Sequence, residues 1–219
     1  MPQNPRPRPS LSLPRLYPII DAEACAAVGR APIDVARAFL AGGATWLQLR
    51  CKSVASGPFL DLAGIILEDV RAAHATLIIN DRADIAVLSG ADGLHVGQTD
   101  LTPEDSRTVI GVTAILGLST HTQEQWTAAL GEPVSYIAIG PAFGTGTKAT
   151  GYDAVGLEIV AQAAAAAASH GLPTVAIGGI TIDNAASLID AGARSVAVIS
   201  DLLRGDPEQR CRAFLSALR

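Results

Sequence analysis

The chain has 219 residues, which is enough for one full α/β domain and short for two. Apolar residues make up 49% of it, yet polar residues interrupt every apolar run before about eighteen residues, so a transmembrane helix is not expected. A net charge of −5 without a basic stripe argues against broad nucleic-acid binding, and three scattered cysteines without metal-ligand spacing predict reduced thiols in a cytoplasmic protein.

Residues 1–15 contain five prolines, three arginines and no acidic residue. This much proline prevents a helix, and the stretch lacks the apolar segment that a secretory signal needs. We therefore predict a disordered, Pro/Arg-rich tail over 1–15 and a single domain over 16–219.

Short apolar runs rich in β-forming residues then alternate with amphipathic helical stretches. Stretches such as 33–40, 59–74 and 122–130 repeat apolar residues every three or four positions. This alternation predicts a parallel sheet covered by helices, and the number of units predicts a closed (β/α)8 TIM barrel. The alternative, an open doubly wound sheet, usually has fewer strands and a G-x-G-x-x-G turn, which is absent after the first run. The expected strands are 16–20, 45–50, 76–80, 93–97, 115–119, 136–140, 174–178 and 195–200.

Positive charge comes almost entirely from arginine. The chain has two lysines, Lys52 and Lys148, and each lies in a polar cluster at the end of an expected strand. A lysine ammonium binds phosphate as a mobile point charge, so this placement indicates a site for a phosphorylated, anionic ligand. The alternative is that both are ordinary exposed lysines.

The end of the second expected strand carries three polar residues, Gln48, Arg50 and Lys52, on one side. Active sites of TIM barrels lie at the carboxyl ends of the strands, where these side chains would form an anion clamp. A structural ion-pair network is the alternative.

Two aspartates follow the third and fourth expected strands. Because neighbouring strands lie about 4.8 Å apart, Asp81 and Asp100 can converge on one cation, and two carboxylates with open positions suit Mg²⁺. The alternative is that each aspartate caps the helix that follows it. Capping explains Asp81 better than Asp100, because Thr102 followed by Pro103 is the better cap for the second helix.

The remaining strand ends predict a phosphate grip. Ser119 ends the fifth strand, and the loop after the sixth carries Thr145, Thr147 and Lys148, although its spacing does not match a P-loop. Loops after the seventh and eighth strands often bind phosphate through backbone N–H groups in such barrels. In this chain those loops contain Gly179, and Ile199 with Ser200.

Two histidines lie near the same strand ends. His95 is expected to be a core or supporting residue, and His121 is a candidate at the mouth.

Taken together in chain order, these strand ends resemble the thiamine phosphate synthase family over residues 16 to about 204. The residues that carry the resemblance are Leu16-Tyr17, Gln48-Leu49-Arg50 with Lys52, Asn80-Asp81, the run from Gly93 to Gln98 with Asp100, Ser119-Thr120-His121, Thr145 with Thr147-Lys148, the run from Ala176 to Ile180, and Ile199-Ser200.

The resemblance implies a transferase that joins 4-amino-2-methyl-5-hydroxymethylpyrimidine diphosphate to a thiazole phosphate, giving thiamine phosphate and diphosphate. In that family the diphosphate is thought to leave first, and the thiazole nitrogen captures a pyrimidine carbocation. The implied roles are pyrimidine diphosphate binding by Gln48, Arg50, Lys52 and Asn80, Mg²⁺ binding by Asp81 and Asp100, contacts on the diphosphate side by Ser119 and Lys148, and thiazole phosphate binding by Thr145, Thr147, Gly179, Ile199 and Ser200.

The chain departs from the family pattern at a few positions. Asp21 follows the first strand where threonine is common, and Cys51 stands where an acid is frequent. The rival interpretations are a thiazole tautomerase of the same superfamily, whose members lack the Gly-Gln-x-Asp and Thr-x-Thr-Lys signatures present here, and a non-catalytic phosphate-binding regulator. A homo-oligomer is the default expectation for the assembly.

Overall fold

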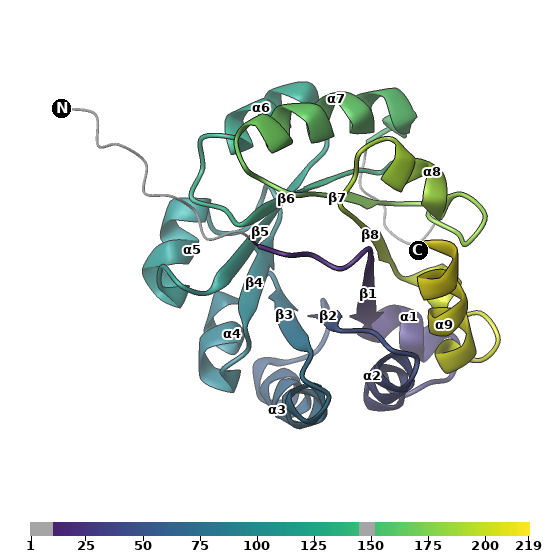
Figure 1. The fold of residues 1–219 in the computed structure, drawn as a ribbon. Coiled ribbons are helices and arrows are strands. Elements are labelled where there is room, and N and C mark those ends of the chain that lie inside the picture. The colour runs from purple at the N-terminus through teal and green to yellow at the C-terminus, as the bar shows by residue number, and fades with distance from the viewer. Residues whose placement is uncertain (1–10, 145–151) are drawn as a thin grey trace.

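The computed structural model describes residues 11–144 and 152–219. Eight parallel strands close into a barrel in which each strand pairs with the next and β8 pairs with β1 (Figure 1). This confirms the predicted (β/α)8 TIM barrel. The strands are β1 (Leu16–Asp21), β2 (Trp46–Arg50), β3 (Thr76–Asn80), β4 (Gly93–Val96), β5 (Ile115–Thr120), β6 (Tyr136–Ile139), β7 (Thr174–Ile177) and β8 (Ser195–Val198).

Helices surround the barrel on its outer side (Figure 1). They are α1 (Ala22–Ala27), α2 (Pro32–Ala41), α3 (Ser56–Ala72), α4 (Ala83–Ser89), α5 (Pro103–Ile110), α6 (Gln123–Ala129), α7 (Gly156–Ser169), α8 (Ala185–Asp190) and α9 (Pro207–Ala217), with a short 3-10 helix, η1 (Ser200–Leu203), after β8. No helix of the described residues is long and apolar enough to cross a membrane.

The strands begin at or one residue after their expected starts, but β8 ends two residues early. It was expected to run to Ser200 and stops at Val198. At Ile199 the backbone turns to φ −113° and ψ −84°, which is outside the extended region, and Ser200 opens η1. The two residues therefore lie in the turn and the 3-10 helix that follow β8, and not in the strand itself.

The apolar core has two layers. The larger lies between the strands and the surrounding helices, and the smaller fills the barrel interior around Tyr17, Trp46 and Tyr136. Leu13 belongs to this inner layer and is buried, although it falls in the stretch expected to be a tail. The segment before β1 crosses the end of the barrel where the strands begin (Figure 1). Leu13 in this segment packs against the apolar side chains of the inner layer. Residues 1–10 lie outside the described residues.

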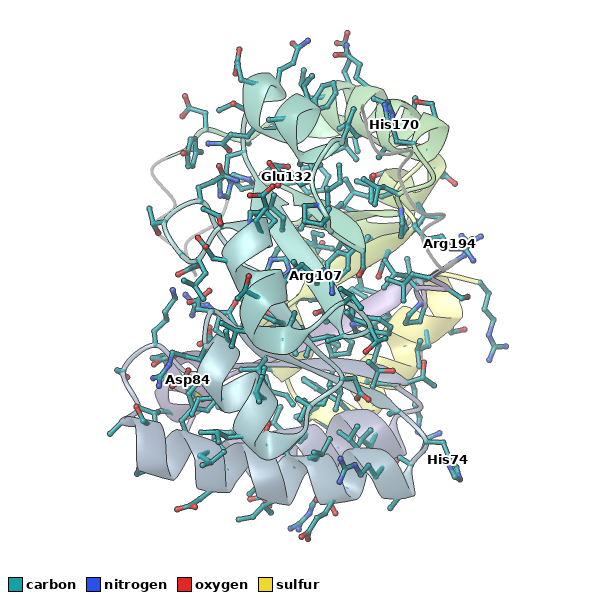
Figure 2. All side chains as sticks on the ribbon, turned by 90° about the vertical axis from the view of Figure 1, so that its left-hand side faces the viewer. His74, Asp84, Arg107, Glu132, His170 and Arg194 are labelled. Atoms are coloured by element: carbon teal, nitrogen blue, oxygen red, sulfur yellow. The ribbon has the colours of Figure 1, made fainter. Side chains whose placement is uncertain are left out.

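Side chains on the outer helices also tie the barrel together. Arg107 of α5 donates to the carbonyl oxygens of Pro133 and Ala114 and to Ser135 Oγ, at 2.8, 2.5 and 3.2 Å. These bonds fix α5 against the segments that enter β5 and β6, on the face that Figure 2 shows. These contacts lie at the end of the barrel where the strands begin, and the candidate site lies at the other end, where the strands finish.

Candidate active site

The end of β2 is held by its neighbour β1. Asp21 lies opposite Arg50 in the strand register, and their side chains form an ion pair. Asp21 also accepts a hydrogen bond from Ala24 N at 2.8 Å and so caps α1. The sequence left the role of Asp21 open. In the structure, it orients the guanidinium of Arg50 at the mouth.

Gln48 and Lys52 lie on either side of Arg50 along the chain. Gln48 is buried and its amide Nε2 donates to Tyr17 Oη at 2.9 Å. Lys52 is half-exposed, and the backbone around it is fixed by Glu23, whose Oε1 accepts from Lys52 N, Ser53 N and Ser53 Oγ at 2.9, 2.8 and 2.7 Å. Glu23 is therefore a supporting residue that sequence reasoning missed.

Asp81, Asp100 and Lys52 come together at the mouth. The ammonium of Lys52 forms an ion pair with Asp81, and Asp100 lies near enough to act on the pKa of the Asp81 carboxyl group. Burial raises the pKa of Asp81 above its ordinary value, Lys52 opposes this rise, and the nearby Asp100 adds to it. Two carboxylates this close repel unless a proton or a cation lies between them.

Neither aspartate caps a helix through its side chain. The N-cap of α4 is Arg82, which makes no side-chain capping bond, and α5 is capped by Thr102, which accepts from Asp105 N at 3.1 Å. Asp100 instead accepts from Gly97 N at 2.7 Å. The capping alternative is wrong for both residues, so their convergence calls for another reason.

The carboxylate pair suits Mg²⁺ by its chemistry. Mg²⁺ is coordinated by oxygen atoms, and usually only one or two of these come from protein carboxylates. Water and phosphate oxygens occupy its other coordination positions. Among residues 11–144 and 152–219 there is no cluster of three or more His, Cys, Asp or Glu side chains that would form a full metal cage. An ion held by Asp81 and Asp100 would thus keep most of its positions for a ligand.

β3 and β5 contribute the next candidates. Asn80 ends β3, is buried, and lies beside His95 in the strand register. Ser119, near the end of β5, is half-buried, and its Oγ lies 2.8 Å from His95 Nε2. Its carbonyl oxygen accepts from Gln98 Nε2 at 2.7 Å. His95 is therefore a supporting residue, as its place within a strand predicted.

His121, the other histidine considered at the mouth, is engaged by its surroundings. Its Nδ1 lies 2.5 Å from the Gly140 carbonyl oxygen, so that nitrogen carries the hydrogen. The ring stacks on Tyr152 with centroids 4.3 Å apart and an interplanar angle of 13°. This arrangement braces the start and the end of the segment between β6 and α7. Thr145, Thr147 and Lys148 belong to that segment and lie outside the described residues.

The turns after β7 and β8 form the other side of the mouth. Gly178 and Gly179 have φ of 100° and 63°, and a Cβ on Gly179 would lie 2.5 Å from the Gly144 carbonyl oxygen. Only glycine therefore fits there without displacing the neighbouring backbone. Asn184 holds the turn by donating to the Gly179 carbonyl oxygen at 3.1 Å and accepting from Thr181 N at 2.8 Å.

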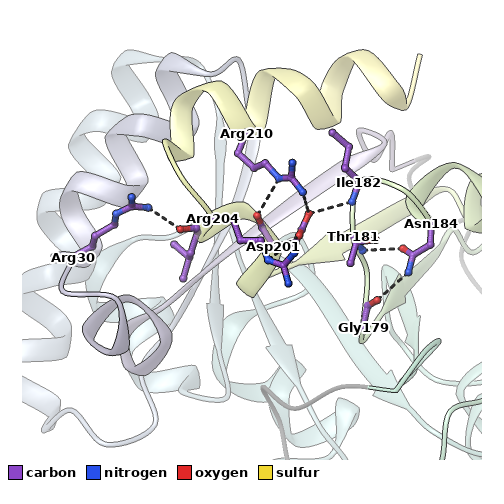
Figure 3. A network of polar contacts seen from close by, with 9 residues as sticks. Arg30, Gly179, Thr181, Ile182, Asn184, Asp201, Arg204 and Arg210 are labelled. Carbon is purple, nitrogen blue, oxygen red and sulfur yellow. Dashed lines mark hydrogen bonds and ion pairs between the residues drawn. The ribbon is translucent and has the colours of Figure 1, made fainter.

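Asp201 fixes this turn to the segment after β8, as Figure 3 shows. Its Oδ2 accepts from Ile182 N at 3.1 Å and from Arg210 at 2.6 Å, and its side chain is 2% exposed. Ile199 and Ser200, the predicted phosphate residues, directly precede it. The sequence offered no signal for Asn184 or Asp201, because both act on backbone groups that only the folded loops bring near.

The predicted residues that the structure describes thus lie at one end of the barrel, on the ends of β2 to β5 and of β7 and β8. The model of the family described as thiamine monophosphate synthase matches residues 16–202. The chain belongs to this family.

Curated relatives of the chain carry the same name. The thiamine-phosphate synthase of Koribacter versatilis is 44% identical over 213 residues, which is 95% of this chain and 97% of that protein. That of Roseiflexus castenholzii is 42% identical over 96% of this chain and 90% of its own length. Among solved structures, the thiamine phosphate pyrophosphorylase of Pyrococcus furiosus has 27% identity and a TM-score of 0.83, covering 93% of this chain and 95% of its own. Family membership makes the protein an enzyme of the transferase class.

Proposed function

We propose that the protein joins 4-amino-2-methyl-5-hydroxymethylpyrimidine diphosphate to thiazole phosphate, forming thiamine phosphate and releasing diphosphate. The observation that carries this proposal is that Lys52, Asp81 and Asp100 lie together on one side of the mouth. The Gly178–Gly179 turn follows β7, which lies across the barrel from the strands that carry these residues. We infer that the first side would bind a metal-bound diphosphate and the second a phosphate monoester, which are the two groups that this reaction brings together.

The reaction asks for little proton transfer and much charge stabilisation. Negative charge develops on the diphosphate as its bond to the pyrimidine methylene breaks, and preorganised positive groups lower that barrier. Arg50 and Lys52 supply such groups, and Lys148 would add a third from the segment after β6. Asp21 keeps Arg50 in place, and its contact uses one of the five guanidinium N–H groups, so that others can reach the anion.

Asp81 and Asp100 would hold Mg²⁺, which when bound neutralises the oxygens of the departing diphosphate. The ion pair with Lys52 partly offsets the charge of Asp81. The pyrimidine would then carry a carbocation, with Gln48 and Asn80 orienting the ring, and the thiazole nitrogen would add to it. Ser119 would donate to the diphosphate side.

The thiazole phosphate would bind the second half of the mouth. Backbone N–H groups of the turn at Gly179 and of the segment after β8 would bind it there, and Thr145 and Thr147 would close on the phosphate from the segment after β6. Binding through backbone groups suits a substrate group that is held but not changed in the reaction.

Diphosphate release by the purified protein tests this function. Release that requires both substrates and Mg²⁺ is the expected result. Conversion of a thiazole substrate without any pyrimidine diphosphate would instead indicate a tautomerase, and binding of phosphorylated ligands without turnover would indicate a regulator. Light scattering on the same sample tests the further expectation of a homo-oligomer.

A further inference from the structure

A chain of buried hydrogen bonds crosses the barrel interior from β2 to β5. Gln48 Nε2 donates to Tyr17 Oη at 2.9 Å, and Tyr17 Oη lies 3.0 Å from Tyr136 Oη. Tyr136 Oη lies 2.9 Å from His95 Nδ1, and His95 Nε2 lies 2.8 Å from Ser119 Oγ. The chain joins two of the proposed ligand-binding residues, Gln48 and Ser119, through three side chains to which the proposed function gives no role.

The register of the sheet makes space for this chain. His95, Gly117 and Tyr136 are neighbours on β4, β5 and β6. A Cβ on Gly117 would collide with the ring of Tyr136 and with His95 Nδ1. Because Gly117 has no side chain, the two rings meet across it and stack with centroids 5.6 Å apart and an interplanar angle of 25°. The contact between His95 and Tyr136 therefore depends on a glycine at one position of the strand between them.

The hydrogens available limit the possible directions of the bonds. Tyr17, Tyr136 and Ser119 each carry one hydroxyl hydrogen, and each tautomer of the His95 imidazole carries one N–H, whereas three bonds link these four groups. One hydrogen is therefore left for a partner outside the chain, and its position depends on which way the donors point.

A hydrogen left over at Tyr17 would be buried without an acceptor. Within the described residues, the polar neighbours of the Tyr17 oxygen besides Tyr136 are the Gln48 amide N–H and the Trp46 indole, and both are donors. If the spare hydrogen is instead on Ser119, it lies on a half-buried side chain near the end of β5, where water or a ligand can accept it. The second direction leaves both buried phenol hydrogens paired within the chain, so it is the more stable one.

We propose that Tyr17, Tyr136 and His95 form a directed relay of hydrogen bonds that commits the Ser119 hydroxyl hydrogen to the diphosphate of the substrate. In this relay Tyr17 donates to Tyr136, Tyr136 donates to His95 Nδ1, and His95 Nε2–H donates to Ser119. The inference rests on the proposed function, and it makes these three residues positioning residues for the leaving group.

The chemistry of the ligand supports this direction. Diphosphate oxygens accept hydrogen bonds, so a Ser119 that donated to His95 would present only lone pairs to the anion. Burial raises the pKa of Tyr17 to about 12 and that of Tyr136 well above its ordinary value. Both phenols therefore keep their hydrogens near neutral pH. Gln48, with an N–H engaged by Tyr17, is left with its carbonyl oxygen as an acceptor for the pyrimidine.

A double-mutant cycle between Tyr136→Phe and Ser119→Ala tests the relay, with the single-turnover rate of diphosphate release as the readout. Tyr136→Phe frees His95 to take the other tautomer, and we expect this rate to fall about tenfold, the effect of one hydrogen bond. In the Ser119→Ala background the same change should lower the rate less than about twofold, because the relay then has nothing to orient. The KM for thiazole phosphate should stay unchanged in all variants.

The cycle is repeated with Tyr17→Phe, which lies one bond farther from Ser119 and should have a smaller effect, so that misfolding of one variant still leaves a result. Ser195→Ala is the control, because this hydroxyl is also buried in a strand and has no hydrogen-bond partner in the described residues. It should leave the rate unchanged. Additive losses in either cycle would overturn the relay while leaving the proposed function intact. A wild-type protein that releases no diphosphate would instead overturn the function itself.

Discussion

At the mouth of the barrel, the ends of β2 to β4 carry charged side chains, whereas the ends of β7 and β8 carry glycines and a 3-10 helix. In the first half, Arg50 is paired with Asp21, and Lys52 with Asp81. In the second half, the Gly178–Gly179 turn is fixed from behind by Asn184. One half presents charges that can exchange partners, and the other presents a backbone that is already in place.

This difference matches the two tasks of the proposed reaction. A diphosphate that leaves must be held more tightly as its charge grows, and side-chain charges and a metal provide that. A phosphate that only anchors a substrate needs equal binding throughout, which rigid N–H groups provide. We therefore expect substitutions in the first half to lower the rate of the chemical step, and substitutions in the second half to raise the KM for thiazole phosphate.

The largest effect is expected for Asp100→Ala. Losing one preorganised charge from the diphosphate side should cost about 3–4 kcal/mol of barrier, or two to three decades in kcat. Steady-state diphosphate release at saturating Mg²⁺ and substrates measures it. Asp69→Ala is the matched control, because Asp69 forms an exposed ion pair with Arg37 on the outer helices and should leave kcat unchanged. Wild-type turnover of Asp100→Ala would remove this residue from the site.

Gly179→Ala should act on the other half. Its φ of 63° strains any residue with a side chain, and the added Cβ would push on the Gly144 carbonyl oxygen at 2.5 Å. We expect the KM for thiazole phosphate to rise about tenfold or more, which equals the loss of roughly 1.4 kcal/mol of binding, with the KM for pyrimidine diphosphate unchanged.

Gly171→Ala separates backbone strain from displacement of the turn. Gly171 has a similar φ of 68°, but nothing lies within 4 Å of the position of its Cβ. This variant should lose about 1 kcal/mol of unfolding free energy and keep both KM values. Equal KM changes in the two variants would mean that the turn after β7 does not bind the thiazole phosphate.

The sequence predicted some features of the two halves of the mouth and missed others. It predicted features that follow from a local pattern, and it missed contacts between residues that are far apart in the chain. Strand alternation was enough to predict the polar ends of β2, β3 and β4, and the influence of Asp100 on the pKa of Asp81 follows from neighbouring strands. Asp21 was missed as the partner of Arg50 because that pairing depends on the register of β1 against β2, which no local pattern encodes.

The interior and the second half were harder to predict for a related reason. All six residues of β1 are buried, so alternation could not show that Tyr17 points into the barrel to meet Tyr136, which is 119 residues away. Likewise, Ser200 was expected in a strand because the apolar run continues to it, whereas the backbone turns at Ile199. Periodicity gives the face of a regular element and carries no information about contacts across the barrel or about turns.

Asp201→Asn tests whether rigidity in the second half is what supports phosphate binding. The buried carboxylate holds Ile182 N and Arg210, so an amide there leaves part of this network unpaired. We expect a loss of about 2 kcal/mol of unfolding free energy, which for a chain of this length lowers Tm by about 4–8 °C. The KM for thiazole phosphate should rise as well, and kcat should change little.

The control for Asp201→Asn is Asp206→Asn, which alters an exposed helix cap at α9. It should lower stability by about 1 kcal/mol or less, without any change in KM. If Asp201→Asn loses stability but keeps its KM, the network serves the fold alone.

The smallest effect, a shift in Tm with Mg²⁺, separates the two halves without substrates. An ion that binds only the folded protein stabilises it by RT ln(1 + [L]/Kd), which at about ten times Kd is roughly 1.4 kcal/mol, or a few degrees of Tm here. Wild type and Asp201→Asn should both show this rise, because Asp201 follows β8 and not the strands that carry the proposed metal residues. Asp81→Asn should not show it, since the carboxylate pair is gone.

Without Mg²⁺, Asp81→Asn should melt no lower than wild type. The substitution removes a half-buried carboxyl group, and both burial and the nearby Asp100 disfavour the charged form of that group. A Mg²⁺-dependent rise in Asp81→Asn equal to that of wild type would place the ion elsewhere and break the assignment of the charged half to the metal.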